Sequence, residues 1–265
     1  MKKLFVTALA GAILSTSAFA LETSVAPKVT ALKTVNPTTG LYVGNSFTYY
    51  NCGVNGYVRG FTKEEKRDWT ARMITISAGR LSHHEVCGYL KPHEMDTYVK
   101  PDTKKLFDVV FLQGQSTEPF SKKDGADANF RKYLKQHIDS IRAVGSEPVV
   151  VVTWANSDKP ENYRRLADAI ITEANKNDAI ALPVGLAFAE SLKVRPDLRL
   201  HAPDKRHPSA AGSYLYGAMI YSLLYKKSPE GFKFLGGCEK PIAEADAKHL
   251  QSIAWKVTKE FYGWK

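Results

Sequence analysis

Short apolar runs alternate with stretches of helical periodicity along most of the chain. Each run has the length of a buried strand and is followed by small or polar residues. The predicted strands are residues 40–43, 73–77, 106–112, 147–154 and 180–184. The fourth contains four consecutive valines and is the strongest of the set. The third carries Asp108 as its only charge, which is typical of a strand buried in a parallel sheet.

Helices are predicted between several of these strands and after the last one. Their ranges are 62–72, 126–144, 160–177, 208–225 and 243–261. The first would begin at Thr62, which together with Glu65 matches a capping box. Pro160 and Pro208 stand at first-turn positions, where proline is favoured. Residues 51–60, rich in Gly and Asn, are predicted to form a loop.

Strands that alternate with helices imply right-handed βαβ units. The fold class is therefore α/β, with a mostly parallel central sheet and helices on both faces. No internal repeat, low-complexity segment or linker interrupts the sequence pattern. We expect residues 21–265 to form a single domain.

The first twenty residues have the pattern of an export signal. Lys2 and Lys3 precede an apolar stretch at 4–14, and Ala18–Ala20 has the small residues of a cleavage site. We expect cleavage after residue 20 and a periplasmic or secreted location; a retained membrane anchor is the alternative. No later window approaches the ~20 consecutive apolar residues of a membrane span, so no stable membrane insertion is expected.

Charge narrows the range of partners. Removing residues 1–20, with Lys2 and Lys3, from the 265-residue chain leaves 245 residues with 35 basic and 27 acidic side chains, a net charge of +8. A field of this sign favours anionic surfaces such as acidic polysaccharide, lipid headgroups or nucleic acid. No Lys/Arg block is interleaved with aromatic residues, which argues against nucleic acid. Nothing in the sequence indicates an oligomeric state.

The first predicted strand leads directly into Gly44-Asn45-Ser46. Small neighbours allow the chain to turn tightly and expose the hydroxyl, and backbone N–H groups at such a turn can face developing negative charge. A serine hydroxyl becomes nucleophilic when an imidazole takes its proton and a carboxylate orients that imidazole. Alternatively, Ser46 is a helix cap.

A downstream segment, Asp204-Lys205-Arg206-His207-Pro208, contains the acid and the base that such a serine needs. Pro208 fixes the start of a helix, which leaves His207 at the end of a loop. The three-residue separation lets the Asp204 carboxylate turn back onto the imidazole and fix its tautomer. Alternatively, Asp204 caps a turn and His207 lies on the surface.

Taken together, the serine turn and the Asp-x-x-His-Pro segment resemble the SGNH (GDSL-like) hydrolase superfamily. The sequence of residues 43–48 is most similar to that of its GNSF-type branch, which has Gly-Asn-Ser in place of Gly-Asp-Ser. The resemblance covers about residues 41–225, and its specificity lies in four short blocks. It implies a three-layer α/β/α sandwich of the flavodoxin-like SGNH type, with Ser46 as nucleophile, His207 as base and Asp204 as its partner. No cofactor is expected.

The resemblance also implies an oxyanion hole in which a glycine after the second strand and an asparagine after the third join the N–H of Ser46. Gly79 matches the glycine by position. The asparagine block, usually Gly-x-Asn-Asp, reads Gln113-Gly114-Gln115-Ser116 in this chain. Gln115 falls at the place of the asparagine and could donate from one methylene further out. Gln113 is the alternative donor.

Four residues are candidates for contact with substrate: Asn45, Gln113, Trp154 and Tyr49. Trp154 ends the fourth strand, on the side where the loops of an active site gather, but it could equally pack on the core. Tyr49, Tyr50 and Tyr57 lie close to Ser46 in the sequence and could stack on a sugar ring, although tyrosines also fill cores.

The histidine-rich segments do not indicate a metal site. His83 and His84 are adjacent and lack the i, i+4 spacing of helical ligands, and His93 stands alone beyond them. Support of neighbouring groups, or exposure to solvent, explains these histidines better than a metal site does.

Three cysteines, Cys52, Cys87 and Cys238, predict one disulfide and one free thiol in an exported protein. Cys52 follows the serine turn and Cys87 follows the second strand, so both are expected on the active-site face. The pairing Cys52–Cys87 is favoured, and pairing of either with Cys238 is the alternative.

The predicted function is that of an exported serine ester hydrolase that removes O-acyl groups, with O-acetyl groups on a carbohydrate as the favoured substrate. Export, the basic charge and the tyrosines near Ser46 motivate the choice of carbohydrate. The alternatives are a lipolytic esterase or thioesterase of the same superfamily, and a catalytically degenerate member that binds glycans.

Overall fold

The computed structural model describes residues 23–92, 103–237 and 240–265. Five strands form one sheet in the order β2-β1-β3-β4-β5, and every neighbouring pair is parallel. The strands are β1 (Thr39–Gly44), β2 (Thr70–Thr75), β3 (Val109–Leu112), β4 (Glu147–Val151) and β5 (Ile180–Leu182). The expected α/β class with a mostly parallel sheet is confirmed.

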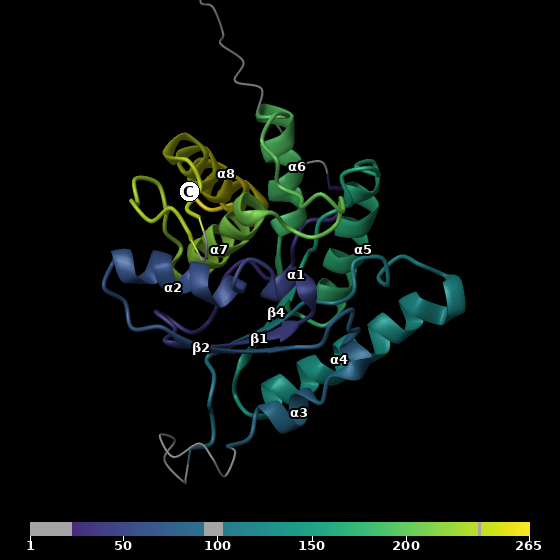
Figure 1. Cartoon of the computed structure of the whole chain (residues 1–265). Helices are drawn as coiled ribbons and strands as arrows, with labels where there is room; N and C mark the ends of the chain where they lie inside the picture. Colours follow the sequence, from purple (N-terminus) through teal and green to yellow (C-terminus); the bar gives the residue numbers. More distant parts are fainter. Residues whose placement is uncertain (1–22, 93–102, 238–239) are drawn as a thin grey trace, which may run out of the picture.

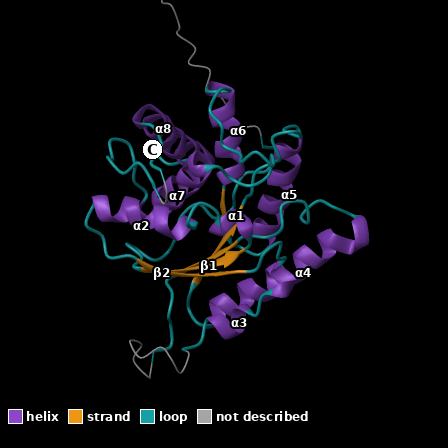
Figure 2. Ribbon diagram, in the orientation of Figure 1, coloured by secondary structure: helices purple, strands orange, loops and turns teal. Residues whose placement is uncertain are grey.

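Helices cover both faces of this sheet (Figures 1 and 2). The longer helices are α2 (Val54–Glu64), α4 (Ala126–Ala143), α5 (Asn162–Lys176), α6 (Val184–Val194), α7 (Ala210–Tyr225) and α8 (Glu244–Tyr262). Shorter turns of helix are α1 (Ser46–Tyr49), α3 (Val86–Tyr89), η1 (Leu81–His83) and η2 (Lys123–Gly125). Helices α2, α7 and α8 lie on one side and α3 and α4 on the other, which gives the predicted three layers.

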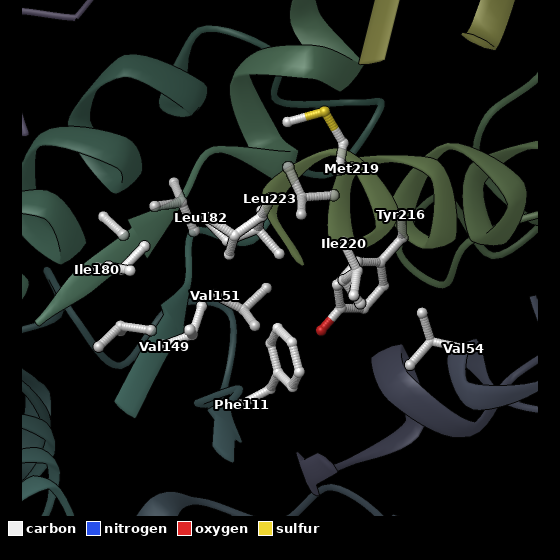
Figure 3. Packing of buried hydrophobic residues seen from close by; sticks show 14 of the residues in the cluster. Val54, Phe111, Val149, Val151, Ile180, Leu182, Tyr216, Met219, Ile220 and Leu223 are labelled. Atoms are coloured by element: carbon white, nitrogen blue, oxygen red, sulfur yellow. The ribbon is translucent and has the colours of Figure 1, made fainter. Parts of the chain in front are cut away.

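Helix α7 is the centre of the layer that it shares with α2 and α8. Of its 16 residues, 14 are buried, because it lies between the sheet and these neighbouring helices. Ile220 and Leu223 of α7 lie over Phe111, Val151 and Leu182 of the strands (Figure 3). This contact places the start of α7, just after Pro208, beside the carboxyl ends of the strands.

The parallel register brings the ends of β1, β2 and β3 to one edge of the sheet. The segments that follow these strands are the serine turn, the turn at Gly79 and the block that begins at Gln113. Gly44 at the end of β1 pairs with Thr75 at the end of β2, and Val43 pairs with Leu112 at the end of β3. Strand β1 is therefore flanked by β2 on one side and β3 on the other. The chain passes from β1 to β2 on one side and then crosses to β3 on the other side of β1, and such a switch point is where α/β sheets form their crevice.

The region between β1 and β2 differs from the prediction. The loop expected at 51–60 belongs largely to α2, and Thr62 lies near the end of this helix, where its hydroxyl donates to Arg59 O at 3.1 Å. Apolar residues at helical spacing outweigh the capping box: Val54, Tyr57, Val58 and Phe61 are all buried. Gly60 lies in close contact with Phe234, since a Cβ there would lie 2.1 Å from the ring.

Two further boundaries differ. Strand β2 begins and ends earlier than the expected 73–77, and helix α6 was not predicted at all. Helix α6 follows β5 after a single residue and is apolar on most sides, so its start merges with the end of the strand in the sequence pattern. The other predicted helices and strands are confirmed to within a few residues.

Candidate active site

The serine turn is held in place by Asn45. The side-chain Oδ1 accepts from Phe47 N at 3.1 Å and so caps α1, while Nδ2 donates to Gly79 O at 2.9 Å. Asn45 is only 4% exposed. These bonds give it the role of fixing Ser46, the first residue of α1, and do not support the predicted contact with substrate.

Gln113 supports the same turn from β3. Its Oε1 accepts from Asn45 N at 3.0 Å and from Thr48 Oγ1 at 2.9 Å, and its Nε2 donates to Gly114 O. A Cβ at Gly44 would lie 2.6 Å from this Oε1, so the turn tolerates only glycine there without a shift. Gln113 is buried with both ends of its amide bonded, which argues against the roles of oxyanion donor and substrate contact.

The loop before α7 brings His207 to Ser46. His207 Nε2 and Ser46 Oγ are 2.8 Å apart, although the two residues are 161 positions apart in the sequence. On the other side of the ring, Nδ1 is hydrogen-bonded to Asp204 Oδ2. Asp204 Oδ1 accepts from the backbone N–H groups of Arg206 and His207, both at 3.0 Å. The structure thus brings together the three residues that the sequence predicted.

These bonds set the charge on the carboxylate and the tautomer of the ring. The hydrogen bond from His207, aided by the two backbone N–H groups, lowers the pKa of Asp204 to about 2. Asp204 is therefore ionised at neutral pH and accepts a hydrogen bond from the N–H at Nδ1 of His207. Nε2 of the neutral ring is then the acceptor for the Ser46 hydroxyl.

Trp154 connects the serine turn to the histidine loop. Its ring lies between Phe47 (centroids 4.7 Å apart, 9° between planes) and Phe188 (4.4 Å, 3°). Its Nε1 donates to Arg206 O at 2.9 Å, next to His207. Trp154 is 1% exposed, so of the two predicted roles the structure favours packing over contact with substrate.

The first expected oxyanion donors are the N–H groups of Ser46 and Gly79. As the first residue of α1, Ser46 has no partner for its N–H within the helix. Gly79, in contrast, donates to Ile76 O at 2.9 Å and closes a turn after β2. Its carbonyl is bound to Asn45, so Gly79 adjoins the serine turn, but its N–H is already in use.

Gln115 lies just beyond β3 with its amide held in one orientation. Its Oε1 accepts from the N–H and hydroxyl of Thr117 at 2.9 and 3.1 Å and from Glu118 N at 3.0 Å. Because the oxygen is fixed by the following turn, the amide NH₂ remains as the donor end. The bonds of Gln115 thus occupy its oxygen and not its NH₂, whereas the amide of Gln113 is bonded at both ends.

The three tyrosines near Ser46 have different positions. Tyr57 is buried against Tyr214 in the core, with ring centroids 6.4 Å apart. Tyr49 is half-buried, and its hydroxyl lies 3.2 Å from Ser77 Oγ, two residues beyond the end of β2. Tyr50 stacks on the imidazole of His207. Only Tyr49 and Tyr50 therefore lie at the site.

The histidines after β2 support the backbone. His84 Nε2 donates to Gly44 O at 3.1 Å, and burial lowers the pKa of His84, which favours the neutral ring. His83 accepts from Arg80 N through Nδ1. Among the described residues, no group of three or more potential ligands is arranged to hold a metal ion. His93 lies outside the described residues.

A cavity of about 1040 Å³ lies behind the histidine loop, between α6 and the residues that follow β4. Phe188 and Trp154 are in its wall, as is Lys205 from the loop itself. Because Trp154 separates Phe188 from Phe47, this cavity is on the far side of the aromatic stack from Ser46.

The predicted disulfide Cys52–Cys87 is wrong. Cys87 is an exposed free thiol in α3, and Cys52 is disulfide-bonded. The connection from β2 to β3 crosses to the other face of the sheet, so α3 packs against α4, while Cys52 precedes α2 on the opposite face. Cys238 lies outside the described residues.

Comparison with solved structures identifies proteins of similar fold. One, provisionally described as an SGNH hydrolase from Slackia heliotrinireducens, is 20% identical, with a TM-score of 0.53, covering 71% of this chain and all of the other. A DUF4886 family protein from Bacteroides uniformis is 17% identical, with a TM-score of 0.63, covering 86% and 96%. A variant of an acetyl xylan esterase from Geobacillus stearothermophilus is 16% identical, with a TM-score of 0.53, covering 73% and 97%.

These likenesses confirm, at the level of the fold, the resemblance to SGNH hydrolases. A scan against protein-family models gives no match to the sequence. A search of curated proteins gives no match either.

The thiol chemistry can be checked directly. Without a reductant, iodoacetamide should label Cys87 in the folded protein and leave Cys52 unlabelled, because of these two described cysteines Cys87 is an exposed free thiol and Cys52 is disulfide-bonded. Peptide mass mapping reads out both sites. In a Cys87→Ser control the label at this position should disappear, and labelling of Cys52 in the unreduced protein would contradict the assignment.

Proposed function

We propose that this chain is an exported carboxylic-ester hydrolase that uses Ser46 as nucleophile, His207 as general base and Asp204 as the partner of the base. The observation that carries the proposal is the hydrogen-bonded chain from Ser46 Oγ through the imidazole to the Asp204 carboxylate. This arrangement joins a nucleophile, a base and a carboxylate in the order that nucleophilic catalysis requires.

In the first half-reaction, Ser46 Oγ attacks the acyl carbon of the ester while its proton passes to His207 Nε2. The resulting imidazolium is stabilised by the ionised Asp204. The tetrahedral intermediate then collapses, the bond from acyl carbon to alcohol oxygen breaks, and the alcohol leaves with the proton from Nε2. In the second half-reaction, His207 activates a water that attacks the acyl-enzyme and releases the carboxylic acid.

The negative charge that develops on the oxygen of the tetrahedral intermediate is stabilised by hydrogen-bond donors around the serine turn. We assign this role to the N–H of Ser46 and the side-chain amide of Gln115. The N–H of Gly79 joins them only if its turn to Ile76 opens. The oxygen of Gln115 is already bonded to its own turn, which supports presentation of the amide NH₂ to the site.

For substrate we propose an O-acyl group on a carbohydrate, with O-acetyl favoured. A neighbouring structure of the same fold is named an acetyl xylan esterase. The net charge of +8 expected after removal of residues 1–20, with 35 basic and 27 acidic side chains, also suits a polymer with anionic groups. Tyr50 stacks on His207 and Tyr49 lies beside Tyr50, so the two rings provide aromatic surface next to the proposed triad. Lipid and thioester substrates remain the alternatives.

We place the protein in the periplasm or outside the cell. The support is the export-signal pattern of residues 1–20, which lie outside the described residues. In the described part of the chain, no helix combines the length and apolar character needed to cross a bilayer.

Ser46→Ala should lower turnover of a p-nitrophenyl ester by about 10⁴-fold or more, because the nucleophile is lost while the fold is kept. A fluorophosphonate probe should label wild type and not this variant. Ser191 is a matched control: it also bonds a histidine, His249, at 3.0 Å, but it is fully buried. Ser191→Ala should keep the label. Absence of labelling in folded wild type would favour the catalytically degenerate, glycan-binding alternative.

Gln115→Ala should lower kcat by ~10²–10³ if its amide holds the oxyanion. Gln115→Glu separates this role from that of a turn cap, because the carboxylate keeps the acceptor for Thr117 and Glu118 but loses the donor. Both variants should therefore be slow, and Gln115→Glu, which keeps the acceptor, should have an unfolding midpoint close to wild type. An active Gln115→Glu enzyme would assign Gln115 to the turn alone.

Acyl-chain preference distinguishes the substrate classes. On p-nitrophenyl esters of increasing length, kcat/KM should be highest for acetate and fall with longer chains, and acetylated oligosaccharides should release acetate. Fastest hydrolysis of long-chain esters would exclude the carbohydrate deacetylase and favour the lipolytic alternative.

A further inference from the structure

Tyr50 and Asn51 follow α1 and reach across to the loop that carries His207. The ring of Tyr50 lies parallel to the imidazole, with centroids 4.0 Å apart and 2° between the planes. Asn51 Nδ2 donates to Pro208 O at 2.9 Å and to Ser213 Oγ at 2.8 Å. We call these two residues the Tyr50–Asn51 strap.

The backbone turns sharply to make this connection. Asn51 and Cys52 both have positive φ, 52° and 69°, a conformation that needs support from its surroundings. The two Asn51 bonds provide such support: one ends on Pro208, the residue after His207, and the other on Ser213 in the first turn of α7. The strap therefore fixes the start of α7 against the end of α1, and with it the distance between the two segments of the site.

The stacked ring supplies a constraint that the hydrogen bonds of the histidine do not. Asp204 at Nδ1 and Ser46 at Nε2 fix the direction of the imidazole within its plane, but a ring held at two opposite atoms can still tilt about the line that joins them. Tyr50 covers one face of the ring, and Phe47 approaches with its edge at 5.7 Å and 76°. The tilt is thereby fixed.

The contact between the Tyr50 ring and the imidazole also affects the stability of a positive charge on His207. In the proposed reaction the imidazole becomes a cation, and the face of an aromatic ring stabilises a cation placed over it. Asp204 is the charged group in contact with the ring, while Lys205 and Arg206, its neighbours in the loop, are exposed. On the strap side, Tyr49 lies beyond Tyr50 with ring centroids 5.7 Å apart.

We propose that Tyr50 is a positioning residue for the proton transfer: it fixes the plane of His207 toward Ser46 Oγ and stabilises the imidazolium that the transfer creates. This rests on the proposed function and adds to it a residue outside the Ser-His-Asp set. No bond to Tyr50 is made or broken in the reaction.

The test compares Tyr50→Phe with Tyr50→Leu on p-nitrophenyl acetate. Tyr50→Phe keeps the ring and should stay within about twofold of wild type. Tyr50→Leu should lower kcat by about 3- to 30-fold, the range of a cation–π contact, with KM within about twofold. The acid limb of its kcat/KM profile should move to lower pH, because the imidazolium loses a stabilising neighbour. Tyr50→Met replaces Tyr50→Leu if the latter does not fold.

Tyr133→Leu is the matched control. Tyr133 also lies beside a histidine, His137, with centroids 6.1 Å apart, but both are on α4, far from the strap. Its loss should leave kcat and the pH profile unchanged. A merely structural role for Tyr50 would lower the unfolding midpoint without the selective fall in kcat or the moved acid limb, and that result would overturn the inference.

The two proposals fail in different ways. If wild type is hydrolytic and labelled by fluorophosphonate while Tyr50→Leu retains wild-type kcat, the inference about Tyr50 is wrong and the proposed function stands. If wild type is neither active nor labelled, both are wrong.

Discussion

The hydrogen bond between Ser46 Oγ and His207 Nε2 is the contact on which the proposed chemistry depends, since it joins two segments 161 residues apart. A parallel sheet makes the contact reachable. Strand β1 delivers the serine at its carboxyl end, and α7, packed over the strands through Ile220 and Leu223, holds the preceding loop above the same edge. Neither segment is useful alone, because a serine without the imidazole is a poor nucleophile.

Precision at this contact comes from polar groups buried beneath it. Gln113 binds the backbone of Asn45 and the hydroxyl of Thr48, and Asn45 in turn caps α1 and binds Gly79. The chain thus has two glutamines in the block where an asparagine is usual, and their tasks differ. Both the oxygen and the NH₂ of the Gln113 amide are hydrogen-bonded in support of the turn, while the bonds of Gln115 occupy its oxygen and leave its NH₂ as a donor. Rigid support of this kind is what a preorganised site requires.

The sequence predicted the strands, the sheet type and the three residues of the proposed triad, because these depend on local apolar runs and on short motifs. It did not predict α2 or the cysteine pairing. The capping box at Thr62 is a local signal that the amphipathic face of α2 overrides through burial against α7. The position of Cys87 depends on the face to which the β2–β3 connection crosses, which no local pattern encodes. Tyr50 was named as a neighbour of Ser46, yet its stacking on His207 follows from a left-handed turn at Asn51.

His207 lies on an exposed loop, so its geometry depends on contacts within that loop and with other parts of the chain. Three side chains provide these contacts. Asp204 holds Nδ1 from within the loop, Trp154 binds the carbonyl of Arg206 from the end of β4, and Tyr50 covers the ring from the end of α1. Trp154 is itself stacked on Phe47, next to the serine, so two of the three supports also contact the segment that carries Ser46. The position of His207 is therefore tied to that of the serine turn, through Phe47 and Trp154 on one side and through Tyr50 on the other.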